Sequence, residues 1–137
     1  MNLSSDQALK AIFEAHKKAL DLKVYPTVTV VDSSGRLIAS IRADGAGFLT
    51  PDTSKAKALA SAAFKKSTKD LSELQKTNPL FWNAVPSIFS DKLLPTTGAV
   101  PIIKDNVLIG AIGVGGGSPE QDHEIALAGL SIFNKKD

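Results

Sequence analysis

The sequence predicts an α+β domain in which helices cover an antiparallel sheet. Two observations carry this prediction: apolar residues recur at helical spacing in three segments, and two pairs of β-rich segments are each joined by a short turn. Strands joined by a tight turn are antiparallel, and amphipathic helices bury their apolar faces against such a sheet. The 137 residues, 43% of them hydrophobic, suffice for one core and contain no linker. We therefore expect a single domain over residues 1–137.

The first segment combines a helix start signal with a helical stripe. Ser4 and Gln7 have the spacing of a capping box, in which each side chain binds the other residue's backbone N–H. This pattern predicts a helix over residues 5–21. One apolar stripe of that helix holds Leu9, Ile12, Phe13, His16 and Leu20.

The next elements form a hairpin and a second helix. Residues 24–32 are rich in β-branched side chains, residues 32–35 supply turn chemistry, and residues 36–42 resume an extended alternation. After Pro51, an alanine-rich stripe from Ala56 to Leu74 predicts one long helix. Between residues 78 and 95, Pro86 and Pro95 leave room only for short pieces that carry aromatic side chains.

The C-terminal third predicts a second hairpin and a last helix. Residues 100–103 and 107–114 flank a Lys-Asp-Asn turn, and the continuous apolar run of the second strand indicates burial on both faces. Ser118, Pro119 and Gln121 combine an N-cap, a first-turn proline and a capping-box glutamine. We expect a helix from there to about Phe133.

Composition excludes several classes of function. The chain has no cysteine, which rules out zinc fingers, disulfide scaffolds and thiol catalysis. Its net charge of +2 is too small for a dedicated nucleic-acid binder. The N-terminal segment has no apolar signal-peptide core, and the run from Val107 to Val114 is too short to cross a bilayer. We expect a cytoplasmic protein without nucleic-acid or membrane partners.

The two histidines have different expected roles. His16 lies in the apolar stripe of the first helix. There it is either a core or interface histidine satisfied by one hydrogen bond, or a neutral imidazole that ligates haem iron. His123 projects away from the apolar side of the last helix and is expected to be a solvated surface residue. Two histidines so placed do not make a closed metal site.

Several polar and glycine-rich segments are candidates for binding. The glycines from Gly110 to Gly117 fit neither nucleotide-binding fingerprint, but a helix N-terminus behind them could hold a carboxylate. Arg42 and Asp44 share strand parity, so they predict either a local ion pair or a guanidinium fork for a carboxylate ligand. Lys57 flanks the alanine stripe and could reach the same region.

Taken together, these segments resemble the GlcG/HbpS-like haem-binding (haem-degrading) family. The resemblance rests on Val30-Val31-Asp32 with Gly35, Arg42-Ala43-Asp44-Gly45-Ala46, Lys57-Ala58, Gly98-Ala99-Val100-Pro101-Ile102, Ile109-Gly110-Ala111-Ile112-Gly113-Val114 and Gln121-Asp122. It runs from the first helix to the last. The order and spacing of the motifs are specific as a set, although each is weak alone.

The resemblance implies a more detailed fold and a ligand. It implies a profilin-like α-β-α sandwich with a five-stranded antiparallel sheet, in the order α-β-β-α-β-β-β-α, so that a fifth strand is expected near residues 46–49 or 94–97. It implies homo-oligomers, as tetramers or octamers, and a haem or other tetrapyrrole as the small-molecule ligand. The matched positions expected to line the pocket are Arg42, Asp44, Lys57, Gly98, Pro101 and Asp122.

Three functional hypotheses follow. The first is a haem-binding module, with or without weak haem-degrading or iron-binding activity, in which His16 ligates iron and Arg42 or Lys57 pairs with the propionates. The second is an enzyme or sensor for a small carboxylate, held by Arg42 and the Gly115–Gly117 turn, with Asp44 or Asp122 handling a proton. The third is a structural oligomer that assembles through its apolar histidine face.

Overall fold

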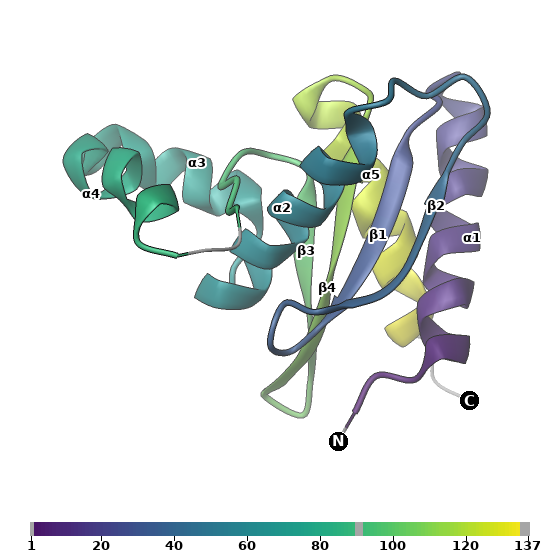
Figure 1. Cartoon of the computed structure of the whole chain (residues 1–137). Helices are drawn as coiled ribbons and strands as arrows, with labels where there is room; N and C mark the ends of the chain where they lie inside the picture. The colour runs from purple at the N-terminus through teal and green to yellow at the C-terminus, as the bar shows by residue number, and fades with distance from the viewer. Residues whose placement is uncertain (1, 90–91, 135–137) are drawn as a thin grey trace.

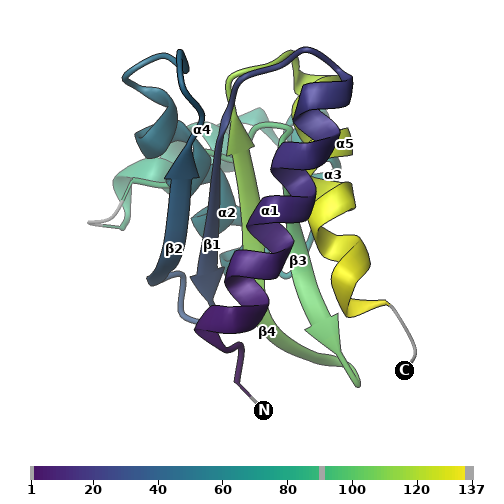
Figure 2. The ribbon, with the colours of Figure 1, turned by 90° about the vertical axis from the view of Figure 1, so that its right-hand side faces the viewer.

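The computed structural model describes residues 2–89 and 92–134 and shows three layers. A four-stranded antiparallel sheet in the order β2-β1-β4-β3 forms the middle layer. Helices α1 and α5 lie side by side on one face, and α2 covers the other (Figures 1 and 2). The predicted α+β class with an antiparallel sheet is confirmed.

Both predicted hairpins are present. Strands β1 (Thr27–Asp32) and β2 (Leu37–Arg42) form the first, and β3 (Ala99–Lys104) and β4 (Val107–Gly115) form the second. The two hairpins join through β1 and β4, which occupy the centre of the sheet. Glycine at position 113 lets α2 approach β4 closely, because a Cβ there would collide with the backbone of Ser54. The centre of the sheet is therefore buried on both faces.

The expected fifth strand is absent from the residues that the structure describes. Residues 46–49 and 94–97 are both irregular. Their backbone groups bind locally: Leu94 N–H donates to the Ala56 carbonyl of α2, and Ala46 N–H donates to the Ala43 carbonyl. Pro95 has no N–H to offer a neighbouring strand. The predicted element order, with three strands after the second helix, is also wrong, since short helices occupy most of that region.

Helix α1 (Ser5–Asp21) has the predicted bounds and the predicted capping box, but a different buried face. Its core side carries Ala8, Ala11, Ile12, Ala15 and Ala19, whereas Phe13 and Leu20 are 59% and 66% exposed. Small residues are required there because α5 packs closely: a Cβ on Gly129 would lie 2.9 Å from the Ala11 carbonyl oxygen. The large apolar residues of the predicted stripe, except Ile12, therefore remain outside the core.

The predicted long helix is two helices. Helix α2 (Thr50–Phe64) ends at Lys65, whose φ of 57° is left-handed. Ser67 then caps α3 (Thr68–Thr77) by accepting a hydrogen bond from the Asp70 backbone N–H. A left-handed residue followed by a new N-cap turns the chain, so α3 and α4 (Pro79–Ala84) project from the sheet (Figure 1).

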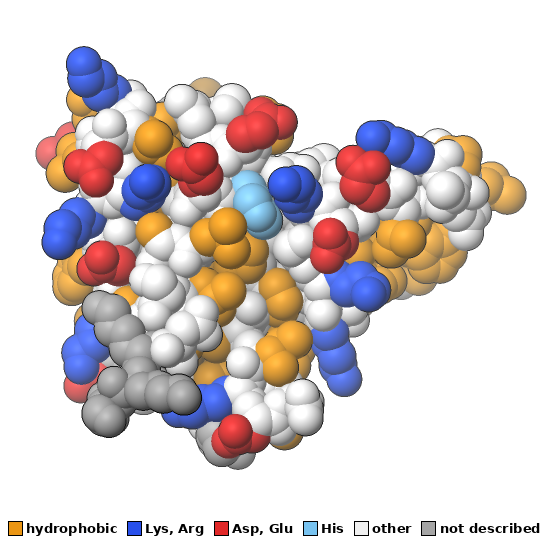
Figure 3. All heavy atoms as spheres, turned by 180° about the vertical axis from the view of Figure 1, so that it is seen from behind, with side chains coloured by type: hydrophobic (Ala, Val, Ile, Leu, Met, Phe, Trp, Pro, Cys, Tyr) orange, Lys and Arg blue, Asp and Glu red, His pale blue; other side chains and the backbone are white. Residues whose placement is uncertain are grey.

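The short 3₁₀ helix η1 (Val85–Ser87) follows α4. Helix α5 (Pro119–Leu130) follows β4 and leads into a second 3₁₀ helix, η2 (Ser131–Phe133). The capping box of Ser118 and Gln121 is present, as predicted. No described helix has the length and apolar composition that crossing a bilayer requires. On the face opposite to that of Figure 1, acidic and basic side chains are interspersed (Figure 3), so the described part of that face offers no continuous basic surface.

Candidate functional site

Three of the predicted pocket residues meet at the end of β4. The ammonium of Lys57, from α2, lies 3.2 Å from Asp122 Oδ2, from α5, and 3.0 Å from the Val114 carbonyl oxygen. Gly98 supplies the space beside them: a Cβ there would lie 3.0 Å from Lys57 Nζ and 2.9 Å from the Val114 oxygen. The pair joins the two helical layers past the end of the strand.

This ion pair is buried and internally satisfied. Lys57 and Asp122 are 8% and 2% exposed, and the Gly117 N–H donates to Asp122 Oδ1 at 2.8 Å. Burial raises the pKa of the Asp122 carboxyl, although the charge of Lys57 and the hydrogen bonds to the carboxyl act in the opposite direction. In this conformation both charged groups are bound to each other and to the backbone, so a ligand role for either residue stays a hypothesis.

The other three predicted pocket residues lie elsewhere. Arg42 is exposed and donates from Nε and Nη2 to the Ala46 carbonyl oxygen, at 3.1 and 2.7 Å. Asp44 is exposed, and among the described residues it forms no ion pair with Arg42. Pro101 is half-buried in the edge strand β3 opposite Ala111, a position that tolerates the missing N–H. The guanidinium of Arg42 is therefore bound to the backbone of the loop that follows its own strand.

The glycine turn before α5 also uses its donors internally. Gly117 N–H binds Asp122, Ser118 N–H binds the Gln121 side chain, and Gln121 N–H binds the Ser118 hydroxyl. A hollow of about 440 Å³ lies beside this turn and the 45–47 loop. A carboxylate in that hollow would have to displace these hydrogen bonds, so the turn is best explained as a helix start.

The histidines behave differently from one another. His16 Nε2 lies 2.9 Å from the Ile41 carbonyl oxygen and, as the N–H tautomer, donates to it. This bond gives His16 the one hydrogen bond that the core interpretation expects, and it leaves Nδ1 as the unprotonated nitrogen, so both interpretations of His16 remain predictions. His123 is half-buried rather than solvated, and its Nδ1 has no hydrogen-bond partner among the described residues. Burial and the Lys69 charge lower the pKa of His123.

The described residues contain no cluster of three or more side chains able to hold a metal ion. Haem iron needs only one or two axial side chains, so this absence does not bear on haem. Apolar hollows lie on the α2 side of the sheet.

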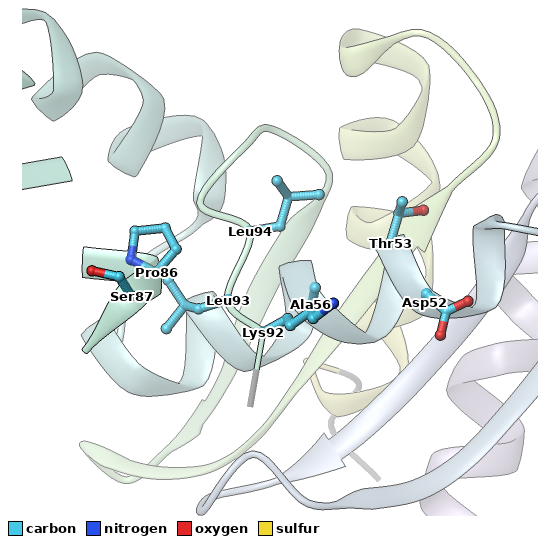
Figure 4. A pocket seen from close by; sticks show the side chains of 8 residues that line it. All are labelled: Asp52, Thr53, Ala56, Pro86, Ser87, Lys92, Leu93 and Leu94. Atoms are coloured by element: carbon cyan, nitrogen blue, oxygen red, sulfur yellow. The ribbon is translucent and has the colours of Figure 1, made fainter. Parts of the chain in front are cut away.

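A groove runs between α2 and the segment that follows α3, and we call it the α2–α4 groove. Two hollows of about 520 and 390 Å³ share Leu93. A third hollow, at the rim, shares Ala56 with the 520 Å³ hollow and Leu59 with the 390 Å³ hollow. The larger two lie within the 300–1,000 Å³ range of small-molecule sites. Figure 4 shows the first hollow, with α2 on one side and Pro86, Ser87 and residues 92–94 on the other. The apolar lining comes from Ala56, Leu59, Ala63, Phe64, Phe81, Val85, Pro86, Ile88, Phe89, Leu93 and Leu94.

Charged side chains line the rim hollow and the adjoining 520 Å³ hollow, which share Asp52 and Lys92. Lys55, Lys92 and Asp52 line the rim hollow, and all three are exposed. Neither lysine forms an ion pair with a residue that the structure describes. The rim therefore carries two cations against one carboxylate, beside an apolar interior.

Sequence reasoning missed this groove. The signal was present as the concentration of aromatic residues between residues 78 and 95, but their closure over α2 depends on the break at Lys65, which the sequence pattern did not reveal.

The comparisons with known proteins decide the family. A family model described as "Haem degrading protein HbpS-like" matches residues 3–131. The chain belongs to this HbpS-like family. Streptomyces reticuli HbpS, solved as a double mutant, has 26% sequence identity and a TM-score of 0.87, covering 96% of this chain and 87% of that one.

Two further matches are a solved haem complex and a longer curated protein. The solved PduOC:heme complex has 27% identity and a TM-score of 0.86, and the match covers 96% of this chain and 94% of that one. Corrinoid adenosyltransferase PduO of Salmonella typhimurium is 28% identical over 120 residues, which is 88% of this chain. The chain spans 35% of the length of that relative, so only one part of PduO is comparable.

Proposed function

We propose that this protein is a haem-binding module. The observation that supports the proposal most directly is the match along nearly the whole chain to PduOC, which was solved with haem. Membership in the HbpS-like family points the same way. The finer proposal, weak haem degradation or iron binding, rests on the family description alone.

The chain also offers a space of suitable chemistry. Haem is a flat apolar ring with two carboxylates at one edge, so a site for it needs an apolar slot and nearby cations. The α2–α4 groove has both, with Lys55 and Lys92 at its rim. The predicted use of Arg42 or Lys57 for the propionates would require each side chain to leave its present partner.

Hemin titration tests the proposal. We expect a saturable Soret band and one bound hemin for each protein chain. His16→Ala tests ligation of the iron by His16, whose Nδ1 is left unprotonated when Nε2–H donates to the Ile41 carbonyl: an unchanged band would exclude His16 as the ligand. A shifted band in that variant would instead assign His16 to the iron. Broad absorbance that never saturates with wild-type protein would contradict haem binding altogether.

The finer proposal of haem degradation has its own readout. The Soret band of the hemin-loaded protein is followed in air with ascorbate, together with the release of chelatable iron. Loss of the band faster than for free hemin supports degradation, whereas a stable band limits the protein to binding.

The second candidate function is recognition of a small carboxylate. The hollow between the 45–47 loop and the 116–118 turn supports it, because Arg42 lies beside that loop. A carboxylate that binds there would raise the melting temperature, since ligand binding stabilises only the folded state. The rise should disappear in Arg42→Ala. A rise that persists in this variant would place the carboxylate elsewhere.

We also propose that the chain forms homo-oligomers. The outer side of α1 leaves Leu9, Phe13 and Leu20 exposed, and such a stripe is costly to leave in water. Light scattering of the wild type and of Phe13→Glu tests this. A defined assembly that dissociates in the variant supports it, and a monomeric wild type contradicts it.

A further inference from the structure

We propose that two copies of this chain join through the outer side of β2, so that their sheets form one continuous antiparallel sheet. The inference rests on the proposed homo-oligomer and adds to it the surface that joins two copies and their relative orientation. Three features support it: one edge of the sheet is blocked and the other is open, an apolar stripe of α1 flanks the open edge, and the charges along that edge are complementary under a two-fold axis.

The sheet has two edge strands, and β3 is the protected one. The N–H of Ala99 in β3 donates to Thr68 Oγ1 at 2.8 Å, and the same hydroxyl donates to the Ala99 carbonyl oxygen at 3.3 Å. Two positions further along, Pro101 has no N–H to offer. Prolines and covering elements are devices that keep an edge strand from pairing with another chain. Helix α3, which carries the buried Thr68, therefore closes this edge.

The outer side of β2 carries backbone groups that no described residue binds, and we call it the open edge. Ala43 N–H donates to the Pro26 carbonyl just beyond the strand. Because hydrogen-bonded positions alternate along an antiparallel ladder, the backbone groups of Ser40 and Arg42 point away from β1. Figure 2 shows β2 as the outermost strand on its side of the sheet. Such an edge is a template for pairing with another strand.

An apolar stripe of α1 lies beside the open edge. His16 Nε2 binds the Ile41 carbonyl oxygen of β2, so the side of α1 that carries His16 faces this strand. Leu9, Phe13 and Leu20 lie within about 60° of His16 around the helix axis, at 3.6 residues per turn. All three are exposed. A second copy that pairs with β2 would cover them from the same side, so that apolar burial adds to the backbone hydrogen bonds.

The second copy is the occupant that fits, because a two-fold axis through Ser40 makes the open edge self-complementary. Antiparallel pairing about this axis sets residues before Ser40 in one copy opposite residues after it in the other. Arg36 and Asp44, four positions to either side, then lie close together at both ends of the interface. Both are exposed, and neither forms an ion pair with a described residue.

The alternative registers are less favourable. An axis through Arg42 would set two arginines directly opposite each other, which is destabilising. The irregularity beside Val31 in the β1–β2 ladder offsets the Arg36 end by about one residue, or roughly 3.3 Å, which a long arginine side chain can span. The axis through Ser40 is perpendicular to the sheet, so both α1 helices stay on one face and their apolar stripes face each other.

A cysteine at the axis tests this arrangement in the full-length protein, because the chain has no cysteine of its own. In the proposed dimer, residue 40 faces its own copy across strands whose Cα atoms are about 5.5 Å apart, which a disulfide can bridge. Under mild oxidation, Ser40→Cys should form a covalent dimer. Lys55→Cys is the control: it is exposed on α2, away from the open edge, and should remain monomeric on a denaturing gel at the same concentration.

Two further variant sets measure the strength of the contact by analytical ultracentrifugation. Ser40→Pro removes an outward N–H and should weaken dimerisation at least about tenfold. Ser40→Ala removes only the hydroxyl that binds Thr29 Oγ1 and should leave dimerisation unchanged. Circular dichroism and thermal unfolding establish that each variant retains the fold.

Charge reversal provides a test that does not depend on the proline. Arg36→Asp sets like charges close together at both ends and should weaken dimerisation about tenfold. Arg36→Asp combined with Asp44→Arg restores opposite charges and should recover most of the loss. Both positions are exposed, so the fold of one copy does not depend on them.

Two outcomes would overturn the inference, and they are distinguishable. If wild-type protein is monomeric, the proposed homo-oligomer fails and the edge assignment fails with it. If wild-type protein assembles but Ser40→Cys forms no more covalent dimer than Lys55→Cys, the homo-oligomer stands and the edge assignment is wrong. An assembly that dissociates in Phe13→Glu but persists in both Ser40→Pro and Arg36→Asp would likewise place the interface on α1 alone.

Discussion

Lys57 and Asp122 form a buried ion pair, with Nζ and Oδ2 3.2 Å apart, although 65 positions separate them in the sequence. The pair links α2 on one side of the sheet to α5 on the other, past the end of β4. Each charge has a second partner in the backbone, Val114 O for the ammonium and Gly117 N–H for the carboxylate. The four groups form one connected unit.

We expect the effects of substitutions at Lys57 and Asp122 on the free energy of unfolding to be strongly non-additive. Lys57→Met leaves a buried carboxylate unpaired and should lower the free energy of unfolding by about 3–5 kcal/mol. Asp122→Asn keeps an oxygen for Gly117 N–H but strands the ammonium. The double variant should lose clearly less than the sum of the two single losses, as measured by urea unfolding. Additive losses would show that the two charges do not interact.

Gly98 should be intolerant of a side chain for two separate reasons. Its φ of 142° disfavours L residues, and a Cβ would lie within 3.0 Å of both Val114 O and Lys57 Nζ. Gly98→Ala should therefore lower stability by more than about 1 kcal/mol. Gly45→Ala is the matched control, because its φ is also positive, at 84°, but a Cβ would meet nothing within 4 Å. Equal melting-temperature losses would mean that crowding at Gly98 contributes nothing.

Lys65 is a site for stabilisation. It ends α2 with a left-handed φ of 57°, a conformation that costs a non-glycine residue about 1 kcal/mol. Lys65→Gly should raise the free energy of unfolding by up to about that amount. Lys66→Gly is the control, since Lys66 does not have a positive φ and glycine there only adds freedom to the unfolded chain. A lower melting temperature for Lys65→Gly would contradict the strain argument.

His123 should make stability depend on pH. Burial, and secondarily the Lys69 charge, lower its pKa in the folded state below the ordinary 6.5, against weaker opposing effects of Asp70 and Glu124. As the pH falls below about 6.5, the unfolded chain takes up a proton more readily than the folded one, so the folded state loses stability. The loss continues until the pH passes the folded pKa.

His123→Gln should remove this contribution. Unfolding free energies of wild type and variant are compared between about pH 5 and pH 7.5, so that effects of other groups cancel in the difference. We expect the wild type to lose more stability than the variant at the acidic end. Parallel curves would show that His123 titrates alike in both states.

Local signals were read correctly from the sequence because the groups that cause them are neighbours. The capping boxes of Ser4 and Ser118 need only a glutamine three residues later, and both are present in the structure. Both hairpins follow from β-rich segments separated by turn residues. The fifth strand, in contrast, was implied by family resemblance, and the described residues do not form it. The backbone N–H groups of Leu94 and Ala46 bind nearby carbonyls instead of a neighbouring strand.

Residue patterns were therefore enough to predict the starts of α1 and α5, both hairpins, the α+β class and the family. Tertiary structure alone decided which face of α1 is buried, because α5 approaches through Gly129 and demands alanines rather than Phe13. It also decided that Lys57 meets Asp122, and that residues 81–89 and 92–94 close over α2 to form the groove. Contacts between segments that are distant in the sequence depend on how the layers pack, and a local pattern of residue types does not specify how closely two layers approach.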